Sequence, residues 1–281
     1  MGRIYKRRLP GALSSGQMLQ KLSELSLLSL LQGGNVWLAE DSAMVSLLDQ
    51  CCTGQQDGGP VFAEEVEQVL SEWRRQQEEI HVSSSANHED VASSARQTGR
   101  PSTSGSEGCT YSLTAVRLSL EEAFFLRYVL NALKIVQRAP DGTLQELGDQ
   151  EVWDAFKSIR SNFVSSYAGY HHLKSKGWLP RSGLLYGVDY VLYQMHPLAV
   201  HSEFGVLIVP LAGPHKPDIR WMDVQITNRL INQVSKKLII LYLYECPESP
   251  GHGTPGCLEF FKAEERLIKR WVPTSTRFLT A

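Results

Sequence analysis

Hydrophobic positions along this chain follow two spacings, which predict an alternation of helices and strands. Apolar residues recur every three to four positions in six segments, which predicts helices at residues 17–31, 41–50, 63–80, 119–136, 152–177 and 223–234. Short runs rich in β-branched and aromatic residues predict strands at residues 35–39, 184–193, 204–212 and 237–245. Residues 257–272 fit one or two further strands. The chain is therefore expected to fold as an α/β protein.

Two of these segments carry signals beyond their spacing. Ser119 and Glu122 form a capping-box pattern that predicts a helix start, and an apolar stripe after it predicts a core helix. The members of the stripe are Leu120, Phe124, Leu126, Leu130 and Leu133. The segment at 237–245 is apolar almost throughout, as is typical of a strand that is covered on both faces. The helix at 152–177 is expected to end near Gly177.

Residues 82–108 interrupt this pattern. They are rich in Ser, Thr and Gly and contain almost no large apolar side chains, so they bury too little surface to offset the entropy lost on ordering. We expect a disordered Ser-rich insert there, within an N-terminal helical or α+β region over residues 1–155. A second domain is expected over residues 156–281.

Composition and charge narrow the function classes. The chain has 281 residues and a net charge of −2, which hides −8 over residues 1–156 and +6 over residues 157–281. A basic C-terminal half suits a polyanionic partner, although ordinary surface variation explains it equally well. Five cysteines without CxxC spacing argue against a disulfide scaffold or a structural zinc site. Since no apolar run approaches the roughly 18 residues that a membrane span needs, no membrane partner is expected.

Several familiar catalytic motifs are absent from the sequence. It contains no GxxxxGK[ST] phosphate loop, no GxGxxG after a strand, no GxSxG and no HExxH. The glycine-rich stretch at 251–256 is interpreted as a flexible loop rather than a phosphate site. Scattered acidic residues leave a metal-dependent nuclease as a weak alternative; they are Asp189, Glu203, Asp218 and Asp223.

Three chemically useful side chains cluster around the strands of the basic half. Tyr193 ends one predicted strand, His201 precedes the next, and Lys236 precedes the third. A base, an acid and a fixed cation are sufficient to cleave RNA without a metal, because they take the 2′-hydroxyl proton, protonate the leaving 5′-oxygen and stabilise the phosphorane. Tyrosine is a poor base at neutral pH unless a nearby cation lowers its pKa.

The residues alone leave competing assignments open. His196 competes with His201 for the role of the acid, and Lys237 competes with Lys236 for that of the cation. A packing role for the tyrosine and a structural role for the histidine are also common in proteins. His171 and His172 lie at a predicted helix end and are interpreted as surface residues.

Read together, YGVDYVLYQMHPLAVHSEFGVLIV, NRLINQVSKKLIILYL and IKRWV resemble the catalytic region of the tRNA-splicing endonuclease family. LSLEEAFFLRYVLNAL resembles the segment that precedes this region, so the resemblance covers roughly residues 110–275. It implies a C-terminal domain of the restriction-endonuclease-like kind, acting as a metal-independent endonuclease without a cofactor. The products implied are a 2′,3′-cyclic phosphate and a 5′-hydroxyl.

The resemblance also implies residue roles. Tyr193 would be the general base, His201 the general acid and Lys236 the stabiliser of the pentavalent phosphate. Arg229 and Trp271 match an arginine and a tryptophan that clamp a flipped-out nucleotide by cation–π stacking. In the assembled enzyme, this clamp is expected to serve the site of the other catalytic subunit.

The loop QMHPLAV lacks the Gly-Asp-Pro run and the Arg-Phe of many family members, and it is closer to the larger eukaryotic catalytic subunit, which cleaves the 5′ splice site. The implied partners are an intron-containing pre-tRNA, a second catalytic subunit and two structural subunits in a heterotetramer. The implied location is the nucleus, or the cytoplasm or mitochondrial surface in some lineages. The main rival is a non-catalytic structural subunit of the same complex.

Overall fold

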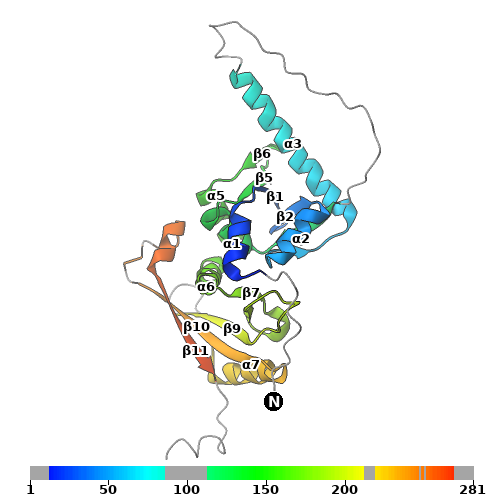
Figure 1. The fold of residues 1–281 in the computed structure, drawn as a ribbon. Coiled ribbons are helices and arrows are strands. Elements are labelled where there is room, and N and C mark those ends of the chain that lie inside the picture. The colour runs from blue at the N-terminus through cyan, green and yellow to red at the C-terminus, as the bar shows by residue number, and fades with distance from the viewer. Residues whose placement is uncertain (1–12, 86–112, 212–218, 247, 250, 269–281) are drawn as a thin grey trace, which may run out of the picture.

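The computed structural model describes residues 13–85, 113–211, 219–246, 248–249 and 251–268. In this part of the chain the strands form two sheets, one of six strands and one of five, with helices around and between them (Figure 1). The fold is thus mixed α/β, as predicted. No helix in the described ranges is long and apolar enough to cross a membrane.

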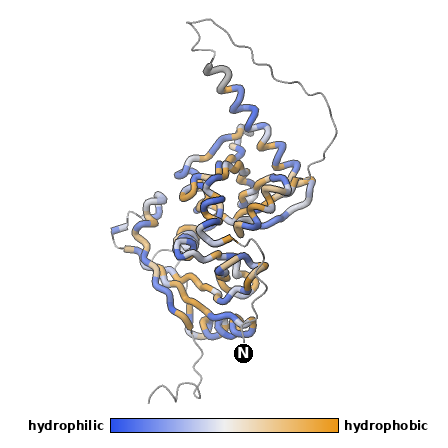
Figure 2. The backbone as a smooth tube through the Cα atoms, viewed as in Figure 1, coloured by the Kyte–Doolittle hydropathy of each residue, from blue (hydrophilic) through white to orange (hydrophobic). Residues whose placement is uncertain are grey.

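The first sheet is built from the N-terminal half, in the order β3-β4-β2-β1-β5-β6. Its strands are β1 (Leu27–Gln32), β2 (Asn35–Glu40), β3 (Gln55–Gln56), β4 (Thr114–Leu118), β5 (Leu133–Arg138) and β6 (Leu144–Glu146). The associated helices are α1 (Ser15–Ser23), α2 (Ser42–Gln50) and the long α3 (Pro60–Ser85). Helix α3 extends beyond the rest of the fold, and Figure 2 shows many hydrophilic residues along it before its grey tip.

The second sheet is built from the C-terminal half, in the order β11-β10-β9-β8-β7. Its strands are β7 (Leu179–Ser182), β8 (Tyr190–Tyr193), β9 (Phe204–Pro210), β10 (Lys237–Glu245) and β11 (Phe261–Ile268). Strands β9 and β10 are parallel and are connected through α7 (Trp221–Gln233), whereas the other neighbours are antiparallel. The chain order β9-α7-β10 is therefore a βαβ unit at the centre of this sheet.

A helix covers each face of the second sheet. Ile239 and Leu241 of β10 pack in the cluster that contains Leu173 of α6 (Phe163–Ser175), while Leu238 and Ile240 pack with Ile231 of α7. Because successive side chains of a strand point to opposite faces, α6 and α7 lie on opposite sides of β10. The prediction that this apolar strand is covered on both faces is confirmed.

A cluster of aromatic side chains joins the two halves of the protein. These rings come from α4 (Leu120–Phe124), α5 (Asp149–Ile159) and α6, and they are Phe124, Trp153, Phe156, Phe163 and Tyr167. All five are fully buried, and the Phe124 ring lies 4.8 Å from the Tyr167 ring in the favourable edge-to-face arrangement. The cluster belongs to a core that extends from α1 to β7, so the two sheets share one hydrophobic interior.

The predicted helix at 119–136 is wrong in its second half. Its capping box is present, since the Glu122 N–H donates to Ser119 Oγ, and α4 continues as a short π helix, η1 (Phe125–Val129). The helix then ends, and Asn131 takes a positive φ of 50° before Leu133 begins strand β5. Leu133 therefore belongs to the core from a strand, beside Leu27 of β1.

The long helix predicted at 152–177 is two helices. Arg160 has an extended backbone that ends α5, and α6 begins at Phe163. The predicted end near Gly177 is confirmed, because the N–H groups of Gly177 and Trp178 donate to the carbonyls of Lys174 and Leu173 in a Schellman motif. The glycine supplies the positive φ of 82° that this motif needs.

Other boundaries differ from the sequence pattern. The helix predicted at 17–31 ends at Ser23, and most of its apolar second half is strand β1. The ambiguous segment at 257–272 forms a short 3₁₀ helix, η3 (Pro255–Phe260), and strand β11. Helix α3 continues to Ser85, so the first residues of the proposed Ser-rich insert are helical. The rest of that insert, residues 86–108, lies outside the described residues.

Candidate active site

The strand register places Tyr193 and Lys236 at one end of the second sheet, and His201 precedes the strand between them. Phe204, the first residue of β9, pairs with Leu192 of β8 on one side and with Lys237 of β10 on the other. Tyr193 follows Leu192 and Lys236 precedes Lys237, so the two lie on either side of the start of β9. His201 lies three residues before β9.

The segment that carries His201 is tied to the start of β10. The Lys237 N–H donates to the Glu203 carbonyl at 2.9 Å, which extends the parallel ladder by one bond beyond β9. His201 itself is exposed, whereas Tyr193 is partly buried against the apolar clusters. The exposed His201 therefore lies in a segment that is hydrogen-bonded to the start of β10, two residues before Glu203.

The backbone of Lys236 is held by the cap that ends α7. The N–H groups of Ser235 and Lys236 donate to the carbonyls of Asn232 and Ile231, which is the Schellman pattern again. Ser235 takes the left-handed position, with φ of 57°, although it has a side chain. This tight turn brings Lys236 directly from the end of α7 to the start of β10.

A tyrosine outside the predicted catalytic set, Tyr186, lies beside Lys236. The Lys236 ammonium lies 5.0 Å from the centre of the Tyr186 ring, and partial burial lowers the pKa of the amine. The next residue, Lys237, has its ammonium 5.8 Å from the Phe204 ring and is exposed. Tyr186 packs with the cluster on the α7 side and Phe204 with the cluster on the α6 side, so the two lysines point to opposite faces.

Tyr193 also packs with the cluster on the α7 side, which makes Lys236 the lysine that shares its face. Lys237 is therefore the weaker candidate for a cation that acts with Tyr193.

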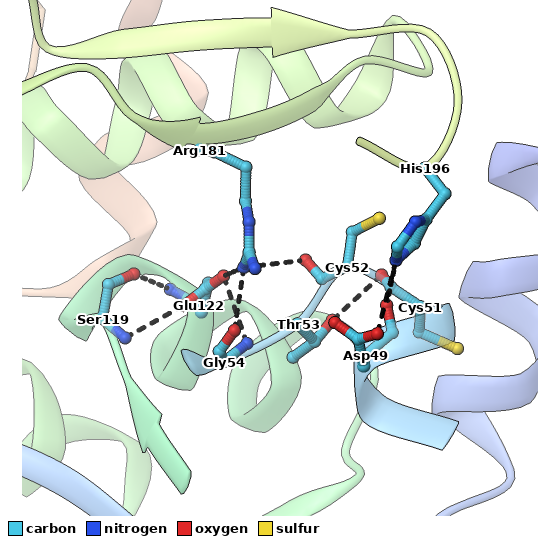
Figure 3. A network of polar contacts seen from close by, with 9 residues as sticks. All are labelled: Asp49, Cys51, Cys52, Thr53, Gly54, Ser119, Glu122, Arg181 and His196. Atoms are coloured by element: carbon cyan, nitrogen blue, oxygen red, sulfur yellow. Dashed lines mark hydrogen bonds and ion pairs between the residues drawn. The ribbon is translucent and has the colours of Figure 1, made fainter. Parts of the chain in front are cut away.

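The rival histidine is engaged elsewhere. His196 Nε2 lies 2.9 Å from the Asp49 carbonyl oxygen (Figure 3). Its Nδ1 accepts from the Leu198 N–H at 3.2 Å. Its side chain is only 13% exposed. Since both ring nitrogens already have partners, His196 is a poor choice for a proton donor to a substrate. His201 remains the candidate.

The segment predicted as a buried strand at 184–193 is a strand only from Tyr190. Residues Leu184–Tyr186 form a 3₁₀ helix, η2, in which Leu184 and Leu185 are 82% and 92% exposed. Helix α7 lies next to η2 and exposes Ile226 and Leu230. An exposed apolar surface therefore lies beside Lys236, at a place where the hydrophobic pattern predicted a core.

Two of the four acidic candidates for a metal site have structural roles. The Ile208 N–H donates to Asp189 Oδ2 at 2.7 Å, and burial raises the pKa of this carboxyl. Asp223 accepts from the Arg220 N–H at the start of α7. Asp218 lies outside the described residues. Among the residues whose positions are described, no group of three or more His, Cys, Asp or Glu side chains could hold a metal ion.

The glycine-rich loop at 251–256 has a packing role in the structure. Its His252 carbonyl accepts from Trp153 Nε1 at 3.1 Å and from Lys157 Nζ at 2.9 Å, which ties the loop to α5. His172, interpreted as a surface residue, pairs with Glu265 of β11. Neither the loop at 251–256 nor the pair of His172 and Glu265 lies at the end of the sheet that carries Tyr193.

The structure describes only one of the two residues of the predicted nucleotide clamp. Arg229 is exposed on α7, seven residues before Lys236, whereas Trp271 lies outside the described residues. The roles of Tyr193, His201, Lys236, Arg229 and Trp271 stay predictions.

Comparison with known proteins agrees with the resemblance seen in the sequence. Residues 163–246 match the family model for the catalytic C-terminal domain of tRNA intron endonucleases. These residues belong to the tRNA intron endonuclease family. The match runs from α6 through the end of β10 and so contains Tyr193, His201 and Lys236. The predicted family and its C-terminal catalytic domain are confirmed.

Several relatives of this family have similar sequences. The tRNA-splicing endonuclease subunit Sen2-1 of Arabidopsis thaliana is 39% identical over 162 residues, which are 58% of this chain and 66% of the relative. Subunit Sen2 of Mus musculus is 33% identical over 168 residues, 58% of this chain and 35% of that protein. Subunit SEN2 of Saccharomyces cerevisiae is 27% identical over 231 residues, covering 80% and 58% of the two chains. The aligned parts thus span about a third to two thirds of these relatives.

Proposed function

We propose that this chain is a catalytic subunit of a tRNA-splicing endonuclease and cleaves intron-containing pre-tRNA at the 5′ splice site. The observation that carries the proposal is the strand register. Tyr193, Lys236 and the segment holding His201 lie at one end of the second sheet, within the part of the chain that matches the catalytic domain of tRNA intron endonucleases. The similarity to Sen2 subunits supports the choice of subunit. The proposed partners are a second catalytic subunit and two structural subunits, assembled as a heterotetramer in the nucleus.

The proposed chemistry is metal-independent transesterification within the RNA. Tyr193, as phenolate, accepts the proton of the 2′-hydroxyl, and the 2′-oxygen attacks the adjacent phosphorus. The bond from phosphorus to the 5′-oxygen breaks, and His201, as imidazolium, donates a proton to that oxygen. The products are a 2′,3′-cyclic phosphate and a 5′-hydroxyl. The Lys236 ammonium stabilises the charge that builds on the phosphorane oxygens.

A second part of the proposal concerns the substrate nucleotides. Arg229, exposed on α7, and Trp271 form a clamp on a flipped-out base, using the guanidinium and indole planes. Helix α7 carries Arg229, and the cap that ends this helix leads directly to Lys236, so one element connects these two residues. The clamp serves the site of the other catalytic subunit in the assembly.

Reconstitution tests the proposal. The chain is combined with its partner subunits and an intron-bearing pre-tRNA, in buffer with and without EDTA, and the cut position and end groups are mapped. The expected result is cleavage at the 5′ splice site in EDTA, with a cyclic phosphate and a 5′-hydroxyl, and loss of that cut alone with His201→Ala. Lys236→Met should slow the same cut, while Lys237→Met serves as the matched control.

The outcomes separate the alternatives. If His201→Ala cuts both sites at wild-type rates, the chain is a structural subunit. If EDTA stops the reaction and added Mg²⁺ restores it, a metal-dependent mechanism replaces the one proposed.

A further inference from the structure

The loop between β8 and β9 is organised around one of its own side chains, His196. Three consecutive amides donate hydrogen bonds to this residue. The Leu198 N–H donates to His196 Nδ1 at 3.2 Å. The N–H groups of Ala199 and Val200 donate to the His196 carbonyl at 2.8 Å and 3.2 Å. Pro197 restricts the backbone of His196 to extended conformations. His196 therefore fixes the turn that leads directly to His201.

The same side chain connects the loop to the N-terminal half of the protein. His196 Nε2 lies 2.9 Å from the carbonyl oxygen of Asp49 and 3.7 Å from its carboxylate (Figure 3). Asp49 lies in the last turn of α2, where the helix dipole is negative, and its carbonyl oxygen also accepts from the Cys52 N–H at 2.8 Å. A donated N–H is favoured at this position.

The two ring nitrogens need opposite hydrogen-bonding roles, and neutral imidazole supplies them. Nδ1 accepts from the Leu198 N–H, which leaves Nε2 to carry the proton and donate to the Asp49 carbonyl. The pattern uses both nitrogens, and the largely buried ring has no free proton to offer a substrate.

The surface that receives His196 is held rigidly to the second sheet. After α2 the chain turns at Cys52 and Gly54, both with positive φ. Arg181 of β7 donates to the Gly54 carbonyl at 2.9 Å and to the Cys52 carbonyl at 3.4 Å. The guanidinium also lies 3.5 Å from Glu122, whose other oxygen accepts from the Ser119 N–H (Figure 3). Because Arg181 pairs with Val191 of β8, this contact anchors the end of α2 beside the strand that carries Tyr193.

We propose that His196 is a positioning residue: it docks the β8–β9 loop onto the end of α2 and thereby fixes His201 relative to Tyr193 and Lys236. This inference rests on the proposed function and gives the N-terminal half a role in catalysis that no motif indicated. Since a displacement of about 1 Å in a catalytic group costs on the order of 100-fold in rate, even a modest loosening of this loop is measurable.

The test compares His196→Ala with His196→Gln in the reconstituted enzyme. Alanine removes both bonds of the ring, and we expect kcat for the 5′ cut to fall about 10- to 100-fold with KM nearly unchanged, because the RNA contacts stay in place. Glutamine keeps an N–H donor near the position of Nε2 and should restore most of the rate. Asp49→Asn is the matched control, since the acceptor is the main-chain carbonyl, and it should cleave as the wild type does.

A second measurement follows the loop without using activity. In the full chain, hydrogen–deuterium exchange should accelerate at Leu198, Ala199 and Val200 in His196→Ala. The Lys237 amide, held by the Glu203 carbonyl, should exchange as in the wild type. A general loss of protection would mean that His196 serves folding rather than loop position, and it would overturn the proposal, as would a wild-type kcat in His196→Ala.

Failure of the proposed function gives a different result. If the wild type does not cleave, or if His201→Ala cleaves equally well, the assignment of the enzyme fails. The exchange experiment then still decides whether His196 orders the loop.

Discussion

The Lys236 ammonium lies 5.0 Å from the centre of the Tyr186 ring. The face of an aromatic ring attracts a cation, whereas partial removal from water disfavours the charge. Partial burial lowers the pKa of Lys236. The residue proposed to stabilise the phosphorane therefore keeps its proton less firmly than a lysine in water.

This lowered pKa predicts an alkaline limit on cleavage. The rate should fall as the amine loses its proton, at a pH below the value of about 10.4 that applies to a free lysine. Lys236→Arg keeps its charge throughout this range, so its rate should not show that fall even if it is lower at neutral pH. Single-turnover rates from pH 6 to pH 10 measure the effect. The same alkaline fall in both enzymes would assign the limit to another group.

The ring beside Lys236 should tune this behaviour. Tyr186→Phe keeps the aromatic face and should cleave as the wild type does, while Tyr186→Leu keeps the bulk but removes the attraction. A loss of about 0.5–1 kcal/mol corresponds to a two- to fivefold lower rate, and the alkaline fall should move to lower pH because the cation is less stabilised. Rates for the two variants across pH make the comparison. Indistinguishable pH profiles for Tyr186→Leu and Tyr186→Phe would show that the ring only packs.

The roles of the base and the acid can be separated with a modified substrate. Replacing the 5′-oxygen at the cleavage site by sulfur gives a thiolate leaving group, which departs without a proton because a thiol is a far stronger acid than an alcohol. His201→Ala should therefore be severely slowed on the normal RNA but close to the wild type on the sulfur-bearing RNA.

Tyr193→Phe should not be rescued in this way, because it removes the base, and it should be slowed about 10²–10⁴-fold on both RNAs. Tyr242→Phe, on β10, is a suitable control. Rescue of Tyr193→Phe with no rescue of His201→Ala would exchange the two assignments.

The central βαβ unit was predictable because its apolar runs are long and unambiguous. Strand β10 coincides with the predicted residues 237–245, and α7 is within two residues of its predicted bounds. The element predictions were wrong where apolar residues lie in turns or on the surface instead of in the core. Leu184 and Leu185 are apolar but exposed, and the glycines on either side of their 3₁₀ helix, Gly183 and Gly187, were the available signal for a turn.

The same distinction applies to the candidate site: residues beside clear strands could be selected from the sequence, and the others could not. Tyr193, His201 and Lys236 were selected as candidates because each lies next to a recognisable strand, and their roles stay predictions. Tyr186 was missed because it was taken for part of a strand. The contact between His196 and Asp49 joins residues 147 positions apart, so it depends on how the two halves pack and no local pattern indicates it.

The N-terminal half offers a prediction that does not depend on activity. Burial, supported by the carboxylates of Asp41 and Glu67 and opposed by Arg74, raises the pKa of Glu40 at the end of β2 to about 7. Between its ordinary value of 4.5 and 7, the folded protein holds a proton that the unfolded chain has lost, so the free energy of unfolding falls as the pH rises through this window.

Glu40→Gln removes this charge and should therefore be more stable than the wild type at pH 8 but not at pH 4.5. The gain is expected to be about 1–2 kcal/mol, less than the full shift implies, because the carboxyl is partly exposed to water. Urea unfolding at both pH values measures it, with Glu79→Gln on the exposed face of α3 as the control. An equal gain at both pH values would mean that the substitution acts through packing rather than through the ionisation of Glu40.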